Sequence, residues 1–310
     1  MPEGDTVHKV AAFLAEALSG QPLTRLLVSG RPMTLGAGLL VGRVTSHGKH
    51  LFIELGTQPD SEPASGLDVP NAIHETPRRT IPPHPRISIR VHLGLYGAWH
   101  WYPIGQPWQK PIARASLILT VAARDFICFN AKEVAVFNGL DPRRHDRTAP
   151  LGPDLTRVSP PPGMLLERAR GLLVPTTPVT DLLLDQRIAC GIGNVYTSEV
   201  LFLEHCHPET RFGALSLARF SALYLTAERL LKANLGGGPR VTRRNRDGRG
   251  HLWVYGRARQ PCLACGTAIQ QARLGRHQRS TYWCPECQRH GTSPAGATTA
   301  GASPPTPDIT

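Results

Sequence analysis

The first twenty residues carry a helical pattern of apolar and polar positions. Apolar side chains recur three or four residues apart, at Val7, Val10, Phe13, Leu14 and Leu18. This spacing places them on one face of an α-helix. Gly20 follows as a stop signal, and Asp5 or Thr6 can cap the first turn. The pattern predicts a helix from Thr6 to Leu18 that packs one face against a core.

From Leu23 to about Val136 the pattern changes to short β-rich runs separated by turn-forming residues. The clearest runs are Leu39–Val44, Leu51–Leu55, Ile87–His92, Ser116–Val121 and Phe126–Asn130. Runs of this kind are typical of an antiparallel sandwich or barrel. Residues 57–85 are rich in proline, serine and charge, which predicts a loop insertion between two strands.

The second half of the chain has helical periodicity. The proline-rich stretch Pro150–Pro162 predicts a linker between domains. Helices are predicted over Met164–Leu173, Val179–Cys190, Val195–Glu204 and Leu215–Asn234. Residues 236–250 are rich in glycine and arginine and are expected to be mobile. We expect an α+β protein with domains at 1–148, 149–250 and 251–290, followed by a disordered tail at 291–310.

Basic residues outnumber acidic ones by 35 to 23, and the formal net charge is +12. Part of this charge is concentrated in one stretch that contains Arg240, Arg243, Arg244, Arg246, Arg249, Arg257 and Arg259. Phosphate contacts and counterion release dominate the affinity of proteins for nucleic acid, so the charge favours a polyanionic partner. The sequence has no apolar run long enough to span a bilayer and no secretory signal pattern. We therefore expect a cytoplasmic protein without a membrane partner.

Four of the seven cysteines are paired in sequence. Cys262 and Cys265 form one Cys-x-x-Cys pair, and Cys284 and Cys287 form another after eighteen residues. Two such pairs on tight turns can close a tetrahedral thiolate cage around Zn²⁺. Four thiolates leave no open coordination position, so the pattern predicts one structural zinc ion. The remaining cysteines, an odd set that suits a reducing compartment, are Cys128, Cys190 and Cys206.

Basic side chains lie between the two cysteine pairs, at Arg273, Arg276, His277 and Arg279. A small finger that presents arginines commonly contacts phosphate. Upstream, the sequence Gly191-Ile192-Gly193-Asn194 separates two predicted helices. The second helix begins with free N–H groups and a positive dipole end, which predicts an anion site. Asn194 either caps that helix or binds a phosphate.

The second residue of the chain is a candidate nucleophile. If Met1 is removed, Pro2 becomes a secondary amine with the Glu3 carboxylate beside it. An α-amine titrates at about 7.7–8.0, so it is partly unprotonated near neutral pH. Such an amine attacks electrophilic carbons, including sugar C1′, and leaves a Schiff base.

Together these features resemble the formamidopyrimidine-DNA glycosylase/endonuclease VIII family of DNA repair enzymes, over most of residues 1–290. The resemblance rests on six motifs taken in order. They are Pro2-Glu3-Gly4, Gly48-Lys49-His50-Leu51, His92-Leu93-Gly94-Leu95-Tyr96-Gly97, Leu184-Asp185-Gln186 with Gly191–Tyr196, Val254-Tyr255-Gly256-Arg257 and Tyr282–Gln288. The resemblance implies an N-terminal helix and two-layer β-sandwich, a helix-two-turn-helix domain and a zinc-finger hairpin.

The resemblance also implies a catalytic set. Pro2 is expected to attack C1′ of a damaged nucleoside, and Glu3 to act as its acid/base partner. Lys49 matches the lysine that reaches the phosphate beside the lesion. His92, Asn194 and Arg279 match the other phosphate-binding positions. The resulting activity would be a bifunctional DNA glycosylase and AP lyase that acts as a monomer on double-stranded damaged DNA.

Leu95 and Tyr96 occupy the loop that, in the family, inserts into the helix when a base is extruded. An apolar side chain in the vacated gap offsets part of the unstacking cost. Guanine-lesion enzymes of the family usually carry methionine here, so the Leu-Tyr pair favours oxidised pyrimidines. Glu199 matches a recurrent acidic position without an assigned role.

The sequence departs from the family pattern in the finger gap, which is about two residues longer than expected, and in the insertion at 57–85. Two other hypotheses stay open. One keeps the same chemistry but acts on oxidised purines such as 8-oxoguanine and formamidopyrimidine. The other is a non-enzymatic zinc-finger DNA-binding protein, which would leave Pro2, Glu3 and Lys49 unexplained.

Overall fold

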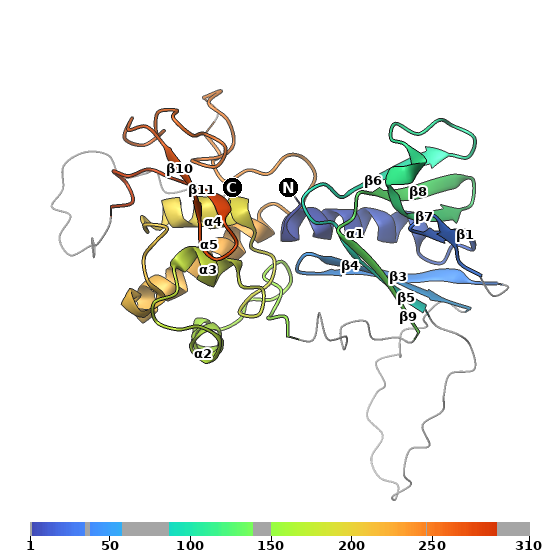
Figure 1. Ribbon diagram of the computed structural model, residues 1–310, viewed down its shortest axis with the longest axis horizontal. Helices are drawn as coiled ribbons and strands as arrows, with labels where there is room; N and C mark the ends of the chain where they lie inside the picture. The colour runs from blue at the N-terminus through green and yellow to red at the C-terminus, as the bar shows by residue number, and fades with distance from the viewer. Residues whose placement is uncertain (1, 35–37, 58–86, 139–149, 246, 290–310) are drawn as a thin grey trace, which may run out of the picture.

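The computed structural model describes residues 2–34, 38–57, 87–138, 150–245 and 247–289. Most of the predicted insertion at 57–85, the predicted tail, Met1 and Arg246 lie outside these residues. The described chain forms a β-sandwich lobe and a helical lobe that carries the finger (Figure 1). This arrangement confirms the expected α+β class.

Helix α1 (Gly4–Leu18) begins two residues earlier than predicted, with Glu3 at its N-cap position. The predicted capping by Asp5 or Thr6 is therefore wrong, since both lie inside the first turn and the Glu3 side chain makes no cap hydrogen bond. The predicted apolar face is buried through Val7, Leu14 and Leu18. These side chains join the core between the two sheets, and Figure 1 shows α1 running alongside both.

Two antiparallel sheets make up the sandwich. The first has the order β2-β1-β7-β8-β6, and the second β3-β4-β5-β9. Their bounds are β1 Leu23–Val28, β2 Arg31–Pro32, β3 Leu40–His47, β4 His50–Gly56, β5 Ile87–His92, β6 Ala98–Pro103, β7 Ala115–Val121, β8 Arg124–Phe129 and β9 Glu133–Asn138. The five predicted runs coincide with β3, β4, β5, β7 and β8. The fold is a sandwich and not a barrel.

The predicted linker is an ordered segment that contacts both lobes. Leu155 is fully buried in the core of the helical lobe. The Asp154 carboxylate accepts hydrogen bonds from Thr156 N at 2.9 Å and from Gly48 N of the sandwich at 2.7 Å. These contacts fix how the β3–β4 turn sits against the helical lobe.

The helical lobe contains α2 (Pro162–Leu172), α3 (Val179–Leu184), α4 (Asn194–Leu203) and α5 (Leu217–Lys232). The prediction of one helix from Val179 to Cys190 is wrong, because α3 ends at Leu184. Asp185 ends it by accepting a hydrogen bond from Arg187 N at 3.0 Å, a local turn that competes with the helix. Residues 185–193 therefore form the double turn between α3 and α4.

The finger is a hairpin of β10 (Gln270–Leu274) and β11 (Arg279–Trp283). Its core joins the helical lobe through Phe202 and Val254, which pack with Ile269, Cys262 and Cys284. At the hairpin turn, Arg276 N donates to both Asp181 carboxylate oxygens. The Arg276 side chain also pairs with Asp185, with Nη2 3.4 Å from Oδ2, so part of the positive charge of the tip is used within the protein.

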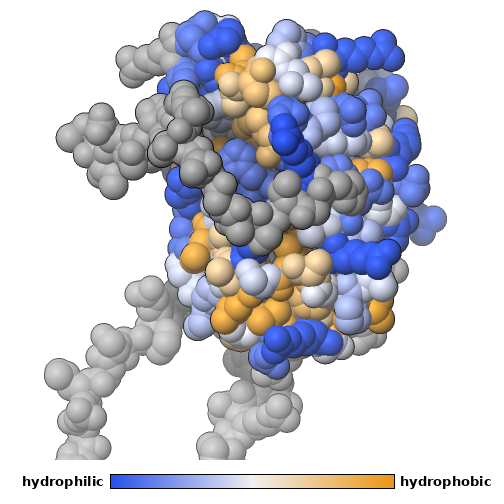
Figure 2. All heavy atoms as spheres, turned by 90° about the vertical axis from the view of Figure 1, so that its left-hand side faces the viewer, coloured by the Kyte–Doolittle hydropathy of each residue, from blue (hydrophilic) through white to orange (hydrophobic). Residues whose placement is uncertain are grey.

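The surface of the helical lobe is predominantly hydrophilic, with scattered apolar side chains. Figure 2 views the molecule from this end and shows hydrophilic side chains around smaller hydrophobic areas. Val174, Leu217 and Leu225 are the most exposed large apolar residues of the lobe. Among the residues that the structure describes, no helix has both the length and the apolar character needed to cross a bilayer.

Candidate active site

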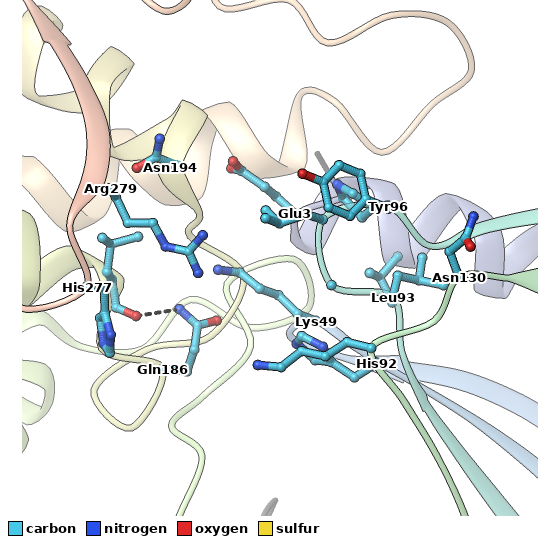
Figure 3. Close-up of a pocket in the computed structure, with 16 residues that line it drawn as sticks. Glu3, Lys49, His92, Leu93, Tyr96, Asn130, Gln186, Asn194, His277 and Arg279 are labelled. Carbon is cyan, nitrogen blue, oxygen red and sulfur yellow. Dashed lines mark hydrogen bonds between the residues drawn. The ribbon is translucent and has the colours of Figure 1, made fainter. Parts of the chain in front are cut away.

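A cleft between the two lobes has a volume of about 550 Å³. All eight residues predicted from the sequence to act on or contact DNA line it: Pro2, Glu3, Lys49, His92, Leu95, Tyr96, Asn194 and Arg279. They come from the start of α1, two turns of the sandwich, the end of β5, the start of α4 and the finger. In Figure 3 the side chains of Lys49 and Arg279 extend toward one another from opposite lobes, below Glu3.

The Glu3 carboxylate joins the two lobes at the start of α4. It is fully buried and accepts backbone hydrogen bonds from Gly193 N at 3.1 Å, Val195 N at 2.7 Å and Tyr196 N at 3.3 Å. The predicted anion site at this helix terminus is present, but its ligand is the protein's own carboxylate. Free N–H groups of the first turn and the helix dipole both favour a negative charge there.

Three glycines make this contact possible. Gly4 N donates to Gly191 O at 2.9 Å, and a Cβ built on Gly4 would lie 2.6 Å from Gly191 Cα. A Cβ on Gly193 would lie 2.3 Å from Cδ of Glu3. Glycine is thus required at both ends of the contact because backbone approaches backbone and carboxylate too closely for any side chain.

Opposing influences act on the protonation of Glu3 and Lys49. Burial raises the pKa of Glu3, while the charges of Arg240 and Lys49 and two of the backbone N–H groups oppose the shift. Burial also lowers the pKa of Lys49, and the Glu3 carboxylate opposes that shift. Burial therefore favours the uncharged forms of both Glu3 and Lys49, while the attraction between their opposite charges favours the charged forms.

Lys49 lies on the β3–β4 turn, which is fixed against the other lobe. Gly48 has a φ of +56°, and a Cβ there would lie 2.7 Å from Cβ of Cys190. Its N–H bonds to Asp154, and His47 Nε2 lies 3.2 Å from Gly152 O. The turn is held from three sides, so its lysine is aimed into the cleft.

His92 ends β5 opposite His50 of β4, with the ring centroids 4.8 Å apart. Burial and neighbouring positive charges lower the pKa of His92 to about 4 and that of His50 to about 3. Both rings are neutral near pH 7. A phosphate contact by His92 would therefore be a hydrogen bond from a neutral imidazole and not an ion pair.

These histidines predict a loss of stability in acid. The unfolded chain binds protons at His50 from pH 6.5 downward, whereas the folded chain does so only near its lowered pKa of about 3. The free energy of unfolding should therefore fall by about 2 kcal/mol between pH 6.5 and about pH 5 through His50 alone. Urea unfolding over this range should show a smaller pH dependence for His50→Gln than for the wild type. An equal dependence in both proteins would contradict the assignment.

Leu95 and Tyr96 form the tip of the β5–β6 turn. They are 44% and 78% exposed, which is unusual for large apolar and aromatic side chains. The turn is closed by a hydrogen bond from Gly97 N to Leu93 O at 3.0 Å. The backbone thus presents both side chains at the mouth of the cleft.

Asn194 links α4 to the finger. Its side-chain amide donates to Ser280 O of β11, beside Arg279. The predicted capping role of Asn194 is wrong, since Gly193 holds the N-cap position and Glu3 satisfies the first turn. Asn194 instead fixes the finger strand that brings Arg279 into the cleft.

Glu199 connects the same helix to the segment before the finger. It is fully buried and accepts hydrogen bonds from Trp253 N, Val254 N and Tyr255 N at 2.8–2.9 Å. A carboxylate that satisfies three backbone donors explains why an acidic residue occupies this helical position.

The four paired cysteines meet at one point. Their sulfur atoms all lie within 4.8 Å of one another, and Cys265 Sγ and Cys284 Sγ are 3.4 Å apart. Tetrahedral thiolates about 2.3 Å from Zn²⁺ lie about 3.8 Å apart. A backbone N–H group in each turn also donates to the first sulfur of that turn, since Ala264 N donates to Cys262 Sγ and Cys287 N to Cys284 Sγ. The donor set therefore fits a closed structural zinc site.

Two regions of the chain match known domain families. Residues 166–244 match the formamidopyrimidine-DNA glycosylase H2TH domain, and residues 259–289 match the zinc finger found in FPG and IleRS. The chain is 34% identical to a probable endonuclease 8 2 of Streptomyces coelicolor, over 98% of this chain and 99% of that protein. It is 36% identical to the DNA-(apurinic or apyrimidinic site) lyase Nei2 of Mycolicibacterium smegmatis, over 93% and 99%.

The chain belongs to the formamidopyrimidine-DNA glycosylase/endonuclease 8 family. This is a family of DNA glycosylase/AP lyases. The fold agrees: a crystal structure of Lactococcus lactis formamidopyrimidine-DNA glycosylase bound to DNA with an AP site matches with a TM-score of 0.69. That match is 19% identical and covers 93% of this chain and 100% of the other.

The structure also shows two residues whose roles in the site the sequence did not indicate, Gln186 and Asp154. Gln186 holds the double turn by donating to Leu184 O at 3.0 Å and Ile192 O at 2.9 Å, the first of which is drawn in Figure 3. Asp154 holds the Lys49 turn. Gln186 is a polar residue within the Leu184-Asp185-Gln186 motif, which is a signal for a role in the site. Asp154 has no such signal, because it lies in the proline-rich segment that composition predicts to be a linker.

The arginine-rich stretch after α5 was also interpreted wrongly. Arg243 is 2% exposed and pairs with Asp247, and Arg240 pairs with Asp5. Two arginines counted as surface charge thus face inward. The described part of the stretch is anchored by these pairs, which contradicts the expectation that it is mobile.

Proposed function

We propose that this protein is a base excision repair enzyme that removes oxidised bases, mainly pyrimidines, and cleaves the strand through a Schiff base on Pro2. The observation that carries the proposal is the meeting of Pro2, buried Glu3 and Lys49 in one cleft. Family membership supports DNA glycosylase/AP lyase activity. The Pro2 chemistry and the lesion class are the further steps that we propose.

The reaction begins with the Pro2 amine, free once Met1 is removed. Its lone pair attacks C1′, the glycosidic bond breaks with its electrons on the base, and the amine proton ends on the departing base. Glu3 then gives its proton to O4′ as the sugar ring opens, which leaves an iminium between Pro2 and C1′. Burial, which raises the pKa of Glu3, favours the protonated form that this step needs.

Strand cleavage follows from the iminium. The Glu3 carboxylate removes a proton from C2′, and the 3′ phosphate leaves by β-elimination. Glu3 then releases its proton to water and removes a proton from C4′, so that the 5′ phosphate leaves by a second, δ-elimination. Water hydrolyses the iminium, which restores the Pro2 amine and releases the sugar fragment as an aldehyde. In this scheme Glu3 alternates between acid and base.

The other residues in the cleft would hold the DNA. Lys49, Arg279 and neutral His92 would bind the phosphates beside the lesion. Asn194 would do the same and would also hold the finger strand in place. Leu95 and Tyr96 would fill the space that the extruded base leaves, which offsets part of the unstacking cost. One zinc ion on the four cysteines would keep the finger folded and so keep Arg279 in place.

Borohydride trapping tests the proposal. The untagged protein should form a covalent adduct with duplexes that contain an abasic site or thymine glycol, because reduction converts the iminium to a stable amine. A protein that retains Met1 or carries an N-terminal tag is the matched control and should form none. Absence of an adduct with the untagged protein would overturn the proposal.

Excision rates across a panel of lesions test the substrate class. Thymine glycol and 5-hydroxycytosine duplexes should react faster than 8-oxoguanine or formamidopyrimidine duplexes. A reversed order would assign the same chemistry to purine lesions.

A further inference from the structure

Arg240 points toward the proposed catalytic carboxylate and not toward the surface. Its guanidinium donates twice to the Asp5 carboxylate, from Nε at 3.0 Å and from Nη2 at 2.5 Å. Its Nη1 lies 3.8 Å from Oε1 of Glu3. The guanidinium carbon lies 4.8 Å from the centroid of the Tyr196 ring, and the side chain is 13% exposed.

The backbone that carries Arg240 is fixed by the end of α5. Asn234 is 5% exposed, accepts a hydrogen bond from Val241 N at 2.7 Å and donates to Val241 O at 2.8 Å. Its amide also donates to Leu230 O, inside the helix. Arg240 is therefore held from its backbone side by Asn234 and from its charged end by Asp5.

We propose that Arg240 is a positioning residue that holds Glu3 against the start of α4 and sets the pH at which Glu3 exchanges its proton, with Asp5 moderating the charge that Glu3 experiences. The inference rests on the proposed function, in which Glu3 is the acid/base group. One guanidinium serves two carboxylates, but only Asp5 is bound through two hydrogen bonds. Replacing Arg240 and replacing Asp5 should therefore shift the pH at which Glu3 exchanges its proton in opposite directions.

Other groups also face Glu3. Lys49 approaches from the β3–β4 turn, the Tyr196 phenol from α4 and the Tyr255 phenol from the segment before the finger. The Pro2 amine is its chain neighbour. These groups are unchanged in the variants proposed below, so a difference between variants reports on Arg240 and Asp5.

The test is the pH profile of single-turnover strand cleavage on an abasic-site duplex, with the untagged full-length protein. Arg240→Gln should move the acidic limb of the profile to higher pH by about 1–3 units, the range that an opposite charge within 4–6 Å produces. Asp5→Asn should move it to lower pH, because Glu3 then has the full charge of Arg240. Arg240→Lys should stay closer to the wild-type midpoint than Arg240→Gln.

Arg249→Gln is the matched control. It removes the same charge from the same segment, but Arg249 pairs with Asp247 and its side chain is 61% exposed. It should leave the midpoint unchanged. A lower rate for Arg240→Gln at every pH, with the wild-type midpoint, would mean a purely structural role and would overturn the inference.

Two further outcomes are distinguishable. If Arg240→Gln does not fold, Asp5→Asn carries the test, and an unmoved acidic limb in that variant overturns the inference. If the wild-type protein forms no trapped adduct and cleaves no abasic strand, the proposed function itself fails, and the role of Arg240 fails with it.

Discussion

Replacing Pro2 by threonine should abolish the borohydride-trapped adduct on abasic DNA. The substitution changes the secondary amine to a primary one with a branched, hydrogen-bonding side chain, in a site where Glu3 is fixed one residue away. Strand cleavage should fall by about 1,000-fold or more if nucleophilic catalysis is lost. Gel analysis of reduced reactions measures both quantities.

The Pro2→Thr variant should keep its fold and its affinity for DNA. Pro2 precedes α1, and the contacts that join the lobes begin at Glu3. Unchanged thermal unfolding and binding to an uncleavable abasic analogue would therefore separate lost chemistry from lost structure. Full adduct formation by this variant would contradict the requirement for a secondary amine at position 2. Adduct formation by the protein that retains Met1, in which position 2 has no free amine, would show that another amine is the nucleophile, and Lys49 would be the first to test.

Replacing Gly193 by alanine should lower strand cleavage by about 100-fold. The new methyl group would lie 2.3 Å from Cδ of Glu3, so the carboxylate must leave the N–H groups of α4. A displacement of about 1 Å in a reacting group costs on the order of a hundredfold in rate. The melting temperature should fall as well, because a buried carboxylate then loses its hydrogen bonds.

Gly163→Ala is the control for this substitution. Gly163 lies in α2, and a Cβ there would have no neighbour within 4 Å among the described residues. Alanine is the better helix former, so this variant should be at least as stable as the wild type and fully active. Wild-type activity in Gly193→Ala would show that Glu3 need not sit on the α4 terminus.

The sequence predicted the elements well where one local pattern dominates. The apolar spacing was sufficient to predict α1, and the β-rich runs were sufficient to predict the core strands. In both cases the burial of one face of the element determines the sequence pattern. Strands β1, β6 and β9 were not singled out. In β6 the sequence Ala98–Pro103 is mainly aromatic and lies at a sheet edge, so it lacks the alternation that marks a half-buried strand.

The sequence also predicted which eight proposed DNA-contacting and catalytic residues come together, since all of them line the cleft, but it did not indicate Asn130 or Lys132, which line it as well. The internal contacts of the cleft were not predictable. No local pattern indicates that Glu3 binds the start of α4, or that Arg240 turns inward to Asp5, because both contacts join segments about 190 residues or more apart. Charge counting treats every arginine alike, whereas the structure separates those that face phosphate from those that neutralise buried carboxylates.

The bond between Glu3 and Gly193 has a consequence for synthesis of the chain. It spans 190 positions, and the ribosome produces the N-terminal partner first. A nascent or truncated polypeptide that ends before Gly191 has the amine and the carboxylate but nothing to seat them. Products of translation that stop before this point are therefore expected to lack the capacity to cut DNA, since the seat of the carboxylate is made only once Gly193 and the start of the next helix have been synthesised.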